Sequence, residues 1–133
     1  MGVTESASPK GNPVAIVCRT GAVTRADQTH TPLELPLADP LGADIATTYL
    51  EVFSGKASSL DVGIWETDPG RSRWDFTESG EVIYVISGRM TVTEDGKDPQ
   101  QIEPGDLVIF PVGWAGFWEV TEPLKKVYVI YEG

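Results

Sequence analysis

Two stretches of this chain decide its fold: GIWETDPGRSRWDFTESGEVIYVISGRMTVTEDG, residues 63–96, and EPGDLVIFPVGWAGFWEVTEPLKKVYVI, residues 103–130. Both alternate short runs of β-branched and aromatic residues with turn residues, at Asp68-Pro69-Gly70, Ser87-Gly88, Pro104-Gly105 and Glu122-Pro123. Such runs favour strands, and such clusters favour turns. Many short, evenly spaced strands without a sustained helical period are typical of a sandwich or a barrel. The sequence therefore predicts an all-β domain.

Strand signals continue on both sides of these stretches. We expect strands at residues 14–18, 47–53, 60–67, 71–77, 80–87, 89–94, 99–103, 106–110, 116–121 and 126–131. Residues 31–44 contain three prolines and predict an irregular connection, with at most a short helix near residues 37–46. Residues 1–13, rich in Gly, Pro and Ser, predict a loose N-terminal arm, which leaves residues 14–133 as a single domain.

Composition excludes several classes of partner. The 133 residues carry a formal net charge of -10, with no basic stripe to neutralise phosphates, so neither nucleic acid nor an anionic membrane is an expected partner. No apolar run approaches the ~18 residues of a membrane span. The single cysteine, Cys18, cannot form an internal disulfide, which suits a reducing compartment. We therefore expect a cytoplasmic protein.

Two predicted strands are apolar on both faces, at residues 82–86 and 127–131. Alternation along a strand normally leaves one polar face for solvent, so both faces of these strands need cover. One face fills the interior, and the other packs either on a second copy of the chain, as a homodimer, or under the N-terminal arm.

The turn residues of the two stretches resemble the paired motifs of the cupin superfamily. Within it, the chain resembles the small proteins similar to the cupin domain of ureidoglycine aminohydrolase, through the signatures GIWETDPG (residues 63–70), PVGWAGFWEV (111–120) and EPLKKVYV (122–129). The residues that match are Gly70, Glu81, Gly88, Gly105, Pro111 and Gly113. The resemblance implies a cupin double-stranded β-helix, which is a jelly-roll barrel. It also implies chemistry on ureides, in which a bound metal polarises the substrate and ammonia is released.

The metal ligands of that family pattern are largely missing. The histidine pair would fall within residues 74–77, WDFT, and the last histidine would stand at Gly116; only the glutamate is present, as Glu81. Transition metals need several imidazole or carboxylate donors that converge on one point. We therefore expect no metal and no other cofactor. The alternative is a weak oxygen-only site in which Asp75 and Glu78 join Glu81.

Rings replace the missing ligands. Trp74 and Phe76 share one parity along their strand, and Trp118 shares that of Gly116, so these rings are expected to line a cavity with Glu81, with Trp114 at its mouth. Gly116 is expected to leave room there. The simpler alternative makes the rings ordinary core, with Glu81 held by a hydroxyl, Arg73 or Arg89. The pair Lys125-Lys126 follows a turn and predicts solvent or a sheet edge.

Two functions from different classes follow. The first is a metal-free protein that binds a small organic metabolite through Trp74, Phe76, Glu81, Trp114 and Trp118. The second is an enzyme that acts on a ureide or a related nitrogen-rich molecule, with Glu81 as general acid or base. A desolvated carboxylate among rings suits either role.

Overall fold

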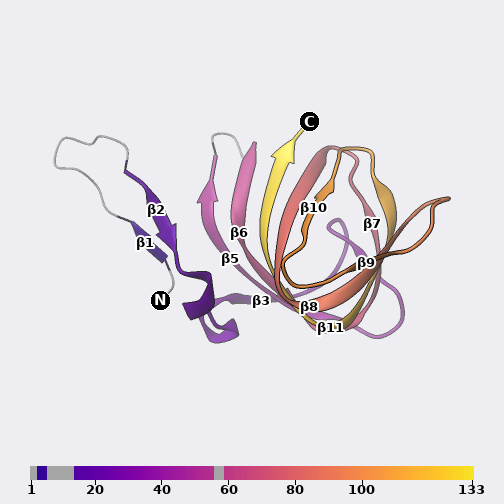
Figure 1. Ribbon diagram of the computed structural model, residues 1–133, viewed down its shortest axis with the longest axis horizontal. Helices are drawn as coiled ribbons and strands as arrows, with labels where there is room; N and C mark the ends of the chain where they lie inside the picture. The colour runs from indigo at the N-terminus through magenta and orange to yellow at the C-terminus, as the bar shows by residue number, and fades with distance from the viewer. Residues whose placement is uncertain (1–2, 6–13, 56–58) are drawn as a thin grey trace.

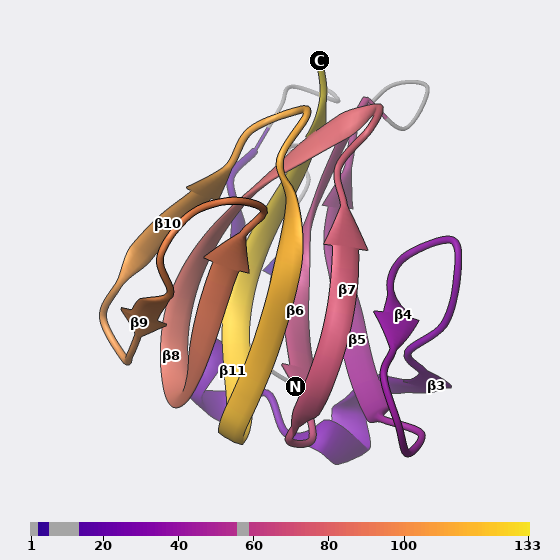
Figure 2. The same cartoon turned by 90° about the vertical axis from the view of Figure 1, so that its right-hand side faces the viewer.

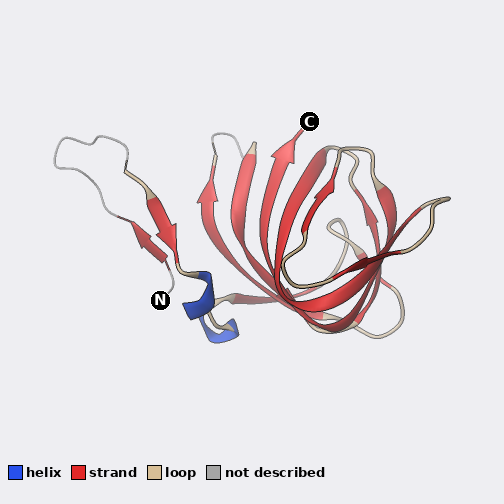
Figure 3. Cartoon of the chain, viewed as in Figure 1, coloured by secondary structure: helices blue, strands red, loops and turns tan. Residues whose placement is uncertain are grey.

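The computed structural model describes residues 3–5, 14–55 and 59–133. The elements are, in order, β1 (Val3–Glu5), β2 (Ile16–Cys18), the 3-10 turns η1 (Thr20–Ala22) and η2 (Arg25–Asp27), β3 (Thr29–Pro32), β4 (Asp39–Pro40), β5 (Ala46–Ser54), β6 (Leu60–Thr67), β7 (Gly70–Asp75), β8 (Ser79–Glu94), β9 (Gln100–Ile102), β10 (Leu107–Phe110) and β11 (Ala115–Glu132). Strands dominate, as predicted (Figure 3). No described helix is long and apolar enough to cross a membrane.

Nine of the strands form one antiparallel sheet that curls into a barrel (Figure 1). Its main path runs β10-β8-β11-β6-β5-β3, while β7 pairs with β11 and with β4, and β9 pairs with β8. In the turned view, β7 and β4 lie on one side of the barrel and β9 and β10 on the other (Figure 2). The small sheet of β1 and β2 lies beside the barrel (Figure 1). The predicted jelly-roll barrel is thus confirmed.

Two long strands, β8 and β11, connect the two walls of the barrel. We predicted separate strands at 80–87 and 89–94, and at 116–121 and 126–131, but β8 and β11 run through both pairs without a break. The C-terminal half of β11, residues 124–131, pairs with β6, and its N-terminal half, residues 115–120, pairs with β7. β8 pairs with β11 along most of the length of the strand. Each long strand therefore belongs to both walls of the barrel.

An irregularity at Gly88 decides which side chains of β8 face inward. Before it, Glu81, Ile83 and Val85 are buried; after it, the buried residues are Met90 and Val92, so the parity of the strand has switched. The pairing with β11 shifts register at this level. Gly88 has a φ of 89°, and a β-carbon there would lie 2.6 Å from the Cα atom of Leu124. Only glycine fits this close approach without strain.

The segment before the regular strands differs from expectation. The short helix allowed near residues 37–46 is absent; this part of the chain contains β4 and the start of β5. The prolines permit β3 and β4 because both are short strands with few ladder bonds to lose. The 3-10 turns lie earlier, and Thr24 and Asp27 cap η2 through a reciprocal pair of hydrogen bonds. The predicted loose arm, residues 1–13, falls outside the described residues except for β1.

Candidate functional site

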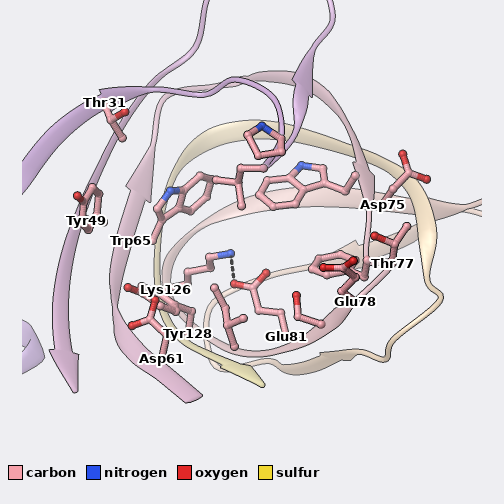
Figure 4. Close-up of a pocket in the computed structure, with 16 residues that line it drawn as sticks. Thr31, Tyr49, Asp61, Trp65, Asp75, Thr77, Glu78, Glu81, Lys126 and Tyr128 are labelled. Atoms are coloured by element: carbon pink, nitrogen blue, oxygen red, sulfur yellow. Dashed lines mark hydrogen bonds and ion pairs between the residues drawn. The ribbon is translucent and has the colours of Figure 1, made fainter. Parts of the chain in front are cut away.

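A cavity of about 460 Å³ opens into the barrel between β6, β7, β8 and β11 (Figure 4). One part of its wall is aromatic and aliphatic, and the rest carries carboxylates, hydroxyls and one amine. The side chains that line it are Thr31, Pro36, Leu37, Tyr49, Asp61, Trp65, Trp74, Asp75, Phe76, Thr77, Glu78, Ser79, Glu81, Lys126, Tyr128 and Ile130. Its volume is large enough to admit a small molecule.

A buried ion pair lies on the wall of this cavity. The Nζ atom of Lys126 donates to the Oε2 atom of Glu81 over 2.7 Å, and the two side chains are only 2% and 4% exposed. Figure 4 shows the contact between β11 and β8. We predicted Lys126 at a sheet edge or in solvent, which is wrong. The two arginines suggested as partners of Glu81 are wrong too, because Arg73 pairs with Asp75 and Asp95, and Arg89 pairs with Glu103.

Three indole rings surround the amine. Nζ of Lys126 lies 4.4 Å from the ring centroid of Trp65, 4.5 Å from that of Trp118 and 5.7 Å from that of Trp74. A cation near the face of an indole is attracted by the ring quadrupole, and the attraction grows when water is excluded. The rings and Glu81 together replace much of the hydration that the ammonium group loses.

Burial shifts the titration of groups around the cavity. Desolvation lowers the pKa of Lys126, and the opposite charge of Glu81 offsets only part of this effect. Desolvation, followed by the nearby charge of Asp61, raises the pKa of Tyr128. The pKa of Asp61 is itself raised, first by burial and then by Glu51. Burial therefore disfavours the charged forms of these three side chains.

The structure brings together three of the predicted site residues. Trp74, Phe76 and Glu81 all line the cavity, as the strand parity indicated. Trp118 does not touch the cavity; it is fully buried behind Trp74, with ring centroids 3.9 Å apart. Trp114 also lies outside the lining and packs edge-on against Phe76 at 6.0 Å. These two rings support the wall rather than form it.

The space expected beside Gly116 is not part of the cavity. A β-carbon on Gly116 would lie 2.7 Å from the ring of Trp114 and would collide with the backbone carbonyl of Thr93. Gly116 thus serves the close packing of β11 on β8. Gly116 is not among the residues that line the cavity.

The donors around Glu81 do not fit a transition metal. The group nearest to its carboxylate is the amine of Lys126, and a cation in that place competes with a metal for the same oxygen atoms. In the described part of the chain, no three His, Cys, Asp or Glu side chains are placed to share an ion. Of the carboxylates suggested for an oxygen-only site, Asp75 is exposed and paired with Arg73.

One sequence signal for Lys126 was available. Leu124, Lys126, Tyr128 and Ile130 alternate along β11 with the parity of Trp118, which is the inward parity. The turn signal at Glu122-Pro123 predicted that a new strand begins after it, so the alternation of Trp118 could not be extended to Lys126 from the sequence. In the structure these residues lie within β11, where the register shifts between Val120 and Lys126. Lys125 points the other way, and its Nζ donates to the carbonyl oxygens of Thr20 and Val23.

Solved structures with the same barrel are numerous, and their low identity makes them evidence of fold alone. A protein of unknown function of the DUF861 family from Pseudomonas syringae pv. tomato has 18% identity and a TM-score of 0.70, over 87% of this chain and 48% of that one. EutQ from Clostridium difficile has 22% identity and a TM-score of 0.57, over 67% and 64%. The cupin domain of Schizosaccharomyces pombe Cnp3 has 13% identity and a TM-score of 0.58, over 65% of each chain.

This chain spans about half the length of the first of these proteins and under two thirds of the second. No curated protein matches it significantly. A family model described as the EutQ-like cupin domain matches residues 54–128, which run from the end of β5 to the middle of β11 and include both Glu81 and Lys126. The chain therefore belongs to the EutQ-like cupin domain family.

Proposed function

We propose that the barrel cavity binds a small organic metabolite without the help of a transition metal. One observation carries this proposal: the ion pair of Glu81 and Lys126 lies on the wall of a cavity of about 460 Å³ whose adjacent wall is made of rings. The rings supply apolar contact area, and the pair supplies one oriented donor and acceptor. A few polar groups in a largely apolar pocket are what fixes the orientation of a ligand.

The chemistry of the wall restricts the ligand. Four carboxylates line the cavity, Asp61, Asp75, Glu78 and Glu81, against the single amine of Lys126. Asp75 is paired with Arg73 and Glu81 with Lys126, which leaves Asp61 and Glu78 to repel a negative charge, so an anionic ligand is disfavoured. We therefore expect an uncharged or cationic metabolite with one flat or apolar part that packs on Trp65, Trp74 or Phe76.

A thermal-shift screen tests the proposal. The screen covers ureides, amino acids, amines, sugars and carboxylates, and a ligand at 100 times its Kd adds about 2.7 kcal/mol to the free energy of unfolding. We expect a hit to stabilise the wild type and Glu119→Gln, which alters an exposed carboxylate of β11, but to lose most of its effect on Glu81→Gln. Equal stabilisation of all three proteins would contradict the role of Glu81. A stoichiometric transition metal that survives dialysis would contradict the metal-free binding.

An enzyme on ureides is the second candidate, with Glu81 as general acid or base. The contact with Lys126 favours it, because a proton shared over 2.7 Å lets the carboxylate gain or release a proton without water. The measurement is ammonia release from ureides. If Glu81→Gln released ammonia as fast as the wild type, this assignment would fail.

A further inference from the structure

Lys126 has the surroundings of a reactive amine rather than of a surface lysine. Its side chain is 2% exposed to solvent, yet it contributes to the wall of the cavity. Figure 4 shows its nitrogen atom directed into the cavity from β11, opposite Glu81 of β8 and beside the ring of Trp65. The amine therefore meets the contents of the cavity before it meets bulk water.

A purely structural role explains this arrangement poorly. A buried ion pair is often no more stabilising than two well-packed apolar side chains of similar volume. The pair also lies beside an open space of about 460 Å³ instead of inside the packed core. Lysines that are desolvated in apolar pockets are the ones that act as nucleophiles on carbonyl groups.

We propose that Lys126 forms an imine with the carbonyl carbon of a small, uncharged or cationic aldehyde or ketone held in this cavity. The inference rests on the proposed function, because it requires that the cavity binds an organic molecule. It goes further in naming the reacting atom, the class of ligand and the covalent bond. The carboxylates Asp61 and Glu78 on the wall are the reason to exclude keto acids.

The step balances with the groups present. Glu81 takes a proton from the ammonium group of Lys126 across their hydrogen bond, and the free amine attacks the carbonyl carbon. One proton then passes from the nitrogen atom to the former carbonyl oxygen, which gives a carbinolamine. The protonated carboxyl group of Glu81 then gives its proton to the departing hydroxyl group, which leaves as water. The products are a protonated imine on Lys126, one water molecule and the Glu81 carboxylate, so the net charge is unchanged.

The electrostatics of the site support this chemistry. Desolvation lowers the pKa of Lys126, which raises the fraction of free amine at neutral pH above that of a lysine in water. The rings of Trp65 and Trp118, at 4.4 and 4.5 Å from the nitrogen atom, accommodate the positive imine as they accommodate the ammonium group. The imine keeps the charge that Glu81 balances.

Reductive trapping is the direct test. The whole protein is incubated at pH 7 with phenylacetaldehyde and cyanoborohydride, and the adducts are located by peptide mass spectrometry. Reduction of the imine adds the mass of the aldehyde less one oxygen atom. We expect the adduct at Lys126 to form about tenfold faster than at exposed Lys97. Phenylpyruvate has the same ring but carries a carboxylate on its carbonyl carbon, and its ratio of labelling at Lys126 to labelling at Lys97 should be at least about tenfold lower than that of the aldehyde.

Variants separate a reactive amine from a merely buried one. Lys125→Arg alters the neighbouring lysine, whose amine is held by Thr20 and Val23, and should leave labelling of Lys126 unchanged. Glu81→Gln should slow the labelling of Lys126 and shift the pH dependence of its rate. Lys126→Arg keeps the positive charge but should abolish labelling at this position. Competition on the wild type, where 2-phenylethanol should protect Lys126 but not Lys97, needs no variant to fold.

The possible failures are distinct. If 2-phenylethanol raises the Tm but no adduct forms at Lys126, or none faster than at Lys97, the imine is refuted while binding in the cavity stands. If no compound of the ligand screen stabilises the protein and no adduct forms, the proposed function itself is refuted. If the rate of labelling at Lys126 is changed neither by 2-phenylethanol nor by Glu81→Gln, the inference is also overturned.

Discussion

At the scale of single residues, the pair of Glu81 and Lys126 dominates the chemistry of this barrel. Each charge is buried, and each has the other as its partner at 2.7 Å. Removal of one partner leaves an uncompensated charge in a poorly hydrated place, whereas removal of both leaves none. The two side chains therefore act as one unit.

We expect Lys126→Met to reduce the free energy of unfolding by about 3–5 kcal/mol, because Glu81 then remains buried without its counter-ion. Glu81→Leu should have a similar cost, and the double variant should cost much less than the sum of the two. Urea unfolding of the wild type, the two single variants and the double variant gives the four free energies of unfolding of this double-mutant cycle. Additive losses would mean that the pair contributes nothing as a pair.

The lowered pKa of Lys126 makes a signed prediction about pH. Its ordinary value is 10.5, and the folded value lies below this because of burial. Between the two values the unfolded chain binds one more proton than the folded chain, so the free energy of unfolding rises with pH, by up to about 1.4 kcal/mol per unit.

Urea unfolding of the wild type and Lys126→Met across this range measures the effect. The difference in stability between the two should widen as the pH approaches 10.5, and Lys97→Met, at an exposed site, should follow the wild type. Parallel curves for wild type and Lys126→Met would show that the folded lysine titrates like a free one.

At the scale of elements, the local sequence pattern predicted where strands occur better than it predicted where each strand begins and ends. Residues 47–53, 60–67 and 106–110 correspond to β5, β6 and β10, because alternation and β-branched residues are properties of the segment itself. The turn signals at Ser87-Gly88 and Glu122-Pro123 were misleading, since the chain bends there inside a strand. Whether such a signal ends a strand or bends it depends on the neighbouring strand, which a single sequence does not show.

The candidate site shows the same limit. Strand parity predicted that Trp74 and Phe76 line a cavity together with Glu81, and all three line it. Lys126 shares the inward parity of Trp118 along β11, but hydropathy argues against a buried lysine, and only its contact with Glu81, 45 residues earlier in the chain, overrides that preference. Gly116 was misjudged for a related reason, because the ring of Trp114 that occupies the adjacent space comes from the turn before it.

The bend in β8 yields a prediction for Gly88→Ala. Gly88 and Gly96 both have positive φ, 89° and 75°, but a β-carbon on Gly88 would meet Leu124, whereas one on Gly96 has open space around it. Gly96→Ala should cost about 1–2 kcal/mol from backbone strain alone, and Gly88→Ala about 1–3 kcal/mol more. Thermal unfolding compares them. Equal losses would mean that the close approach of β8 and β11 is unimportant.

At the scale of the whole molecule, the barrel has a packed end and an open side. Three rings pack against one another in the core, where Phe76, directly after β7, stacks on Phe110 of β10 at 5.5 Å, and Phe110 lies tilted against Trp118 of β11 at 4.9 Å. The cavity lies next to this stack. A rigid aromatic wall beside an open space allows a ligand to bind without reorganising the core.

The homodimer remains a prediction at this scale, as does the cytoplasmic location. On the outer face of β8 and β10, Tyr84 is 47% exposed and its register partner Leu107 is 67% exposed, with Ile109 nearby at 57%. A second copy would cover this face. Light scattering should give twice the mass of the chain for the wild type and a monomer for Leu107→Lys. A wild type that stays monomeric at all concentrations would contradict the dimer.

The cluster of indoles around Lys126 has an optical consequence. The chain has four tryptophans, and three of them, Trp65, Trp74 and Trp118, have ring centroids within 5.7 Å of the Lys126 nitrogen atom. The fourth, Trp114, packs on Phe76 of the cavity wall. Nearly all of the near-ultraviolet emission of the protein therefore originates from rings that either form the wall of the cavity or pack behind it. Its intensity and wavelength are a built-in signal for whatever enters the barrel, with no added dye.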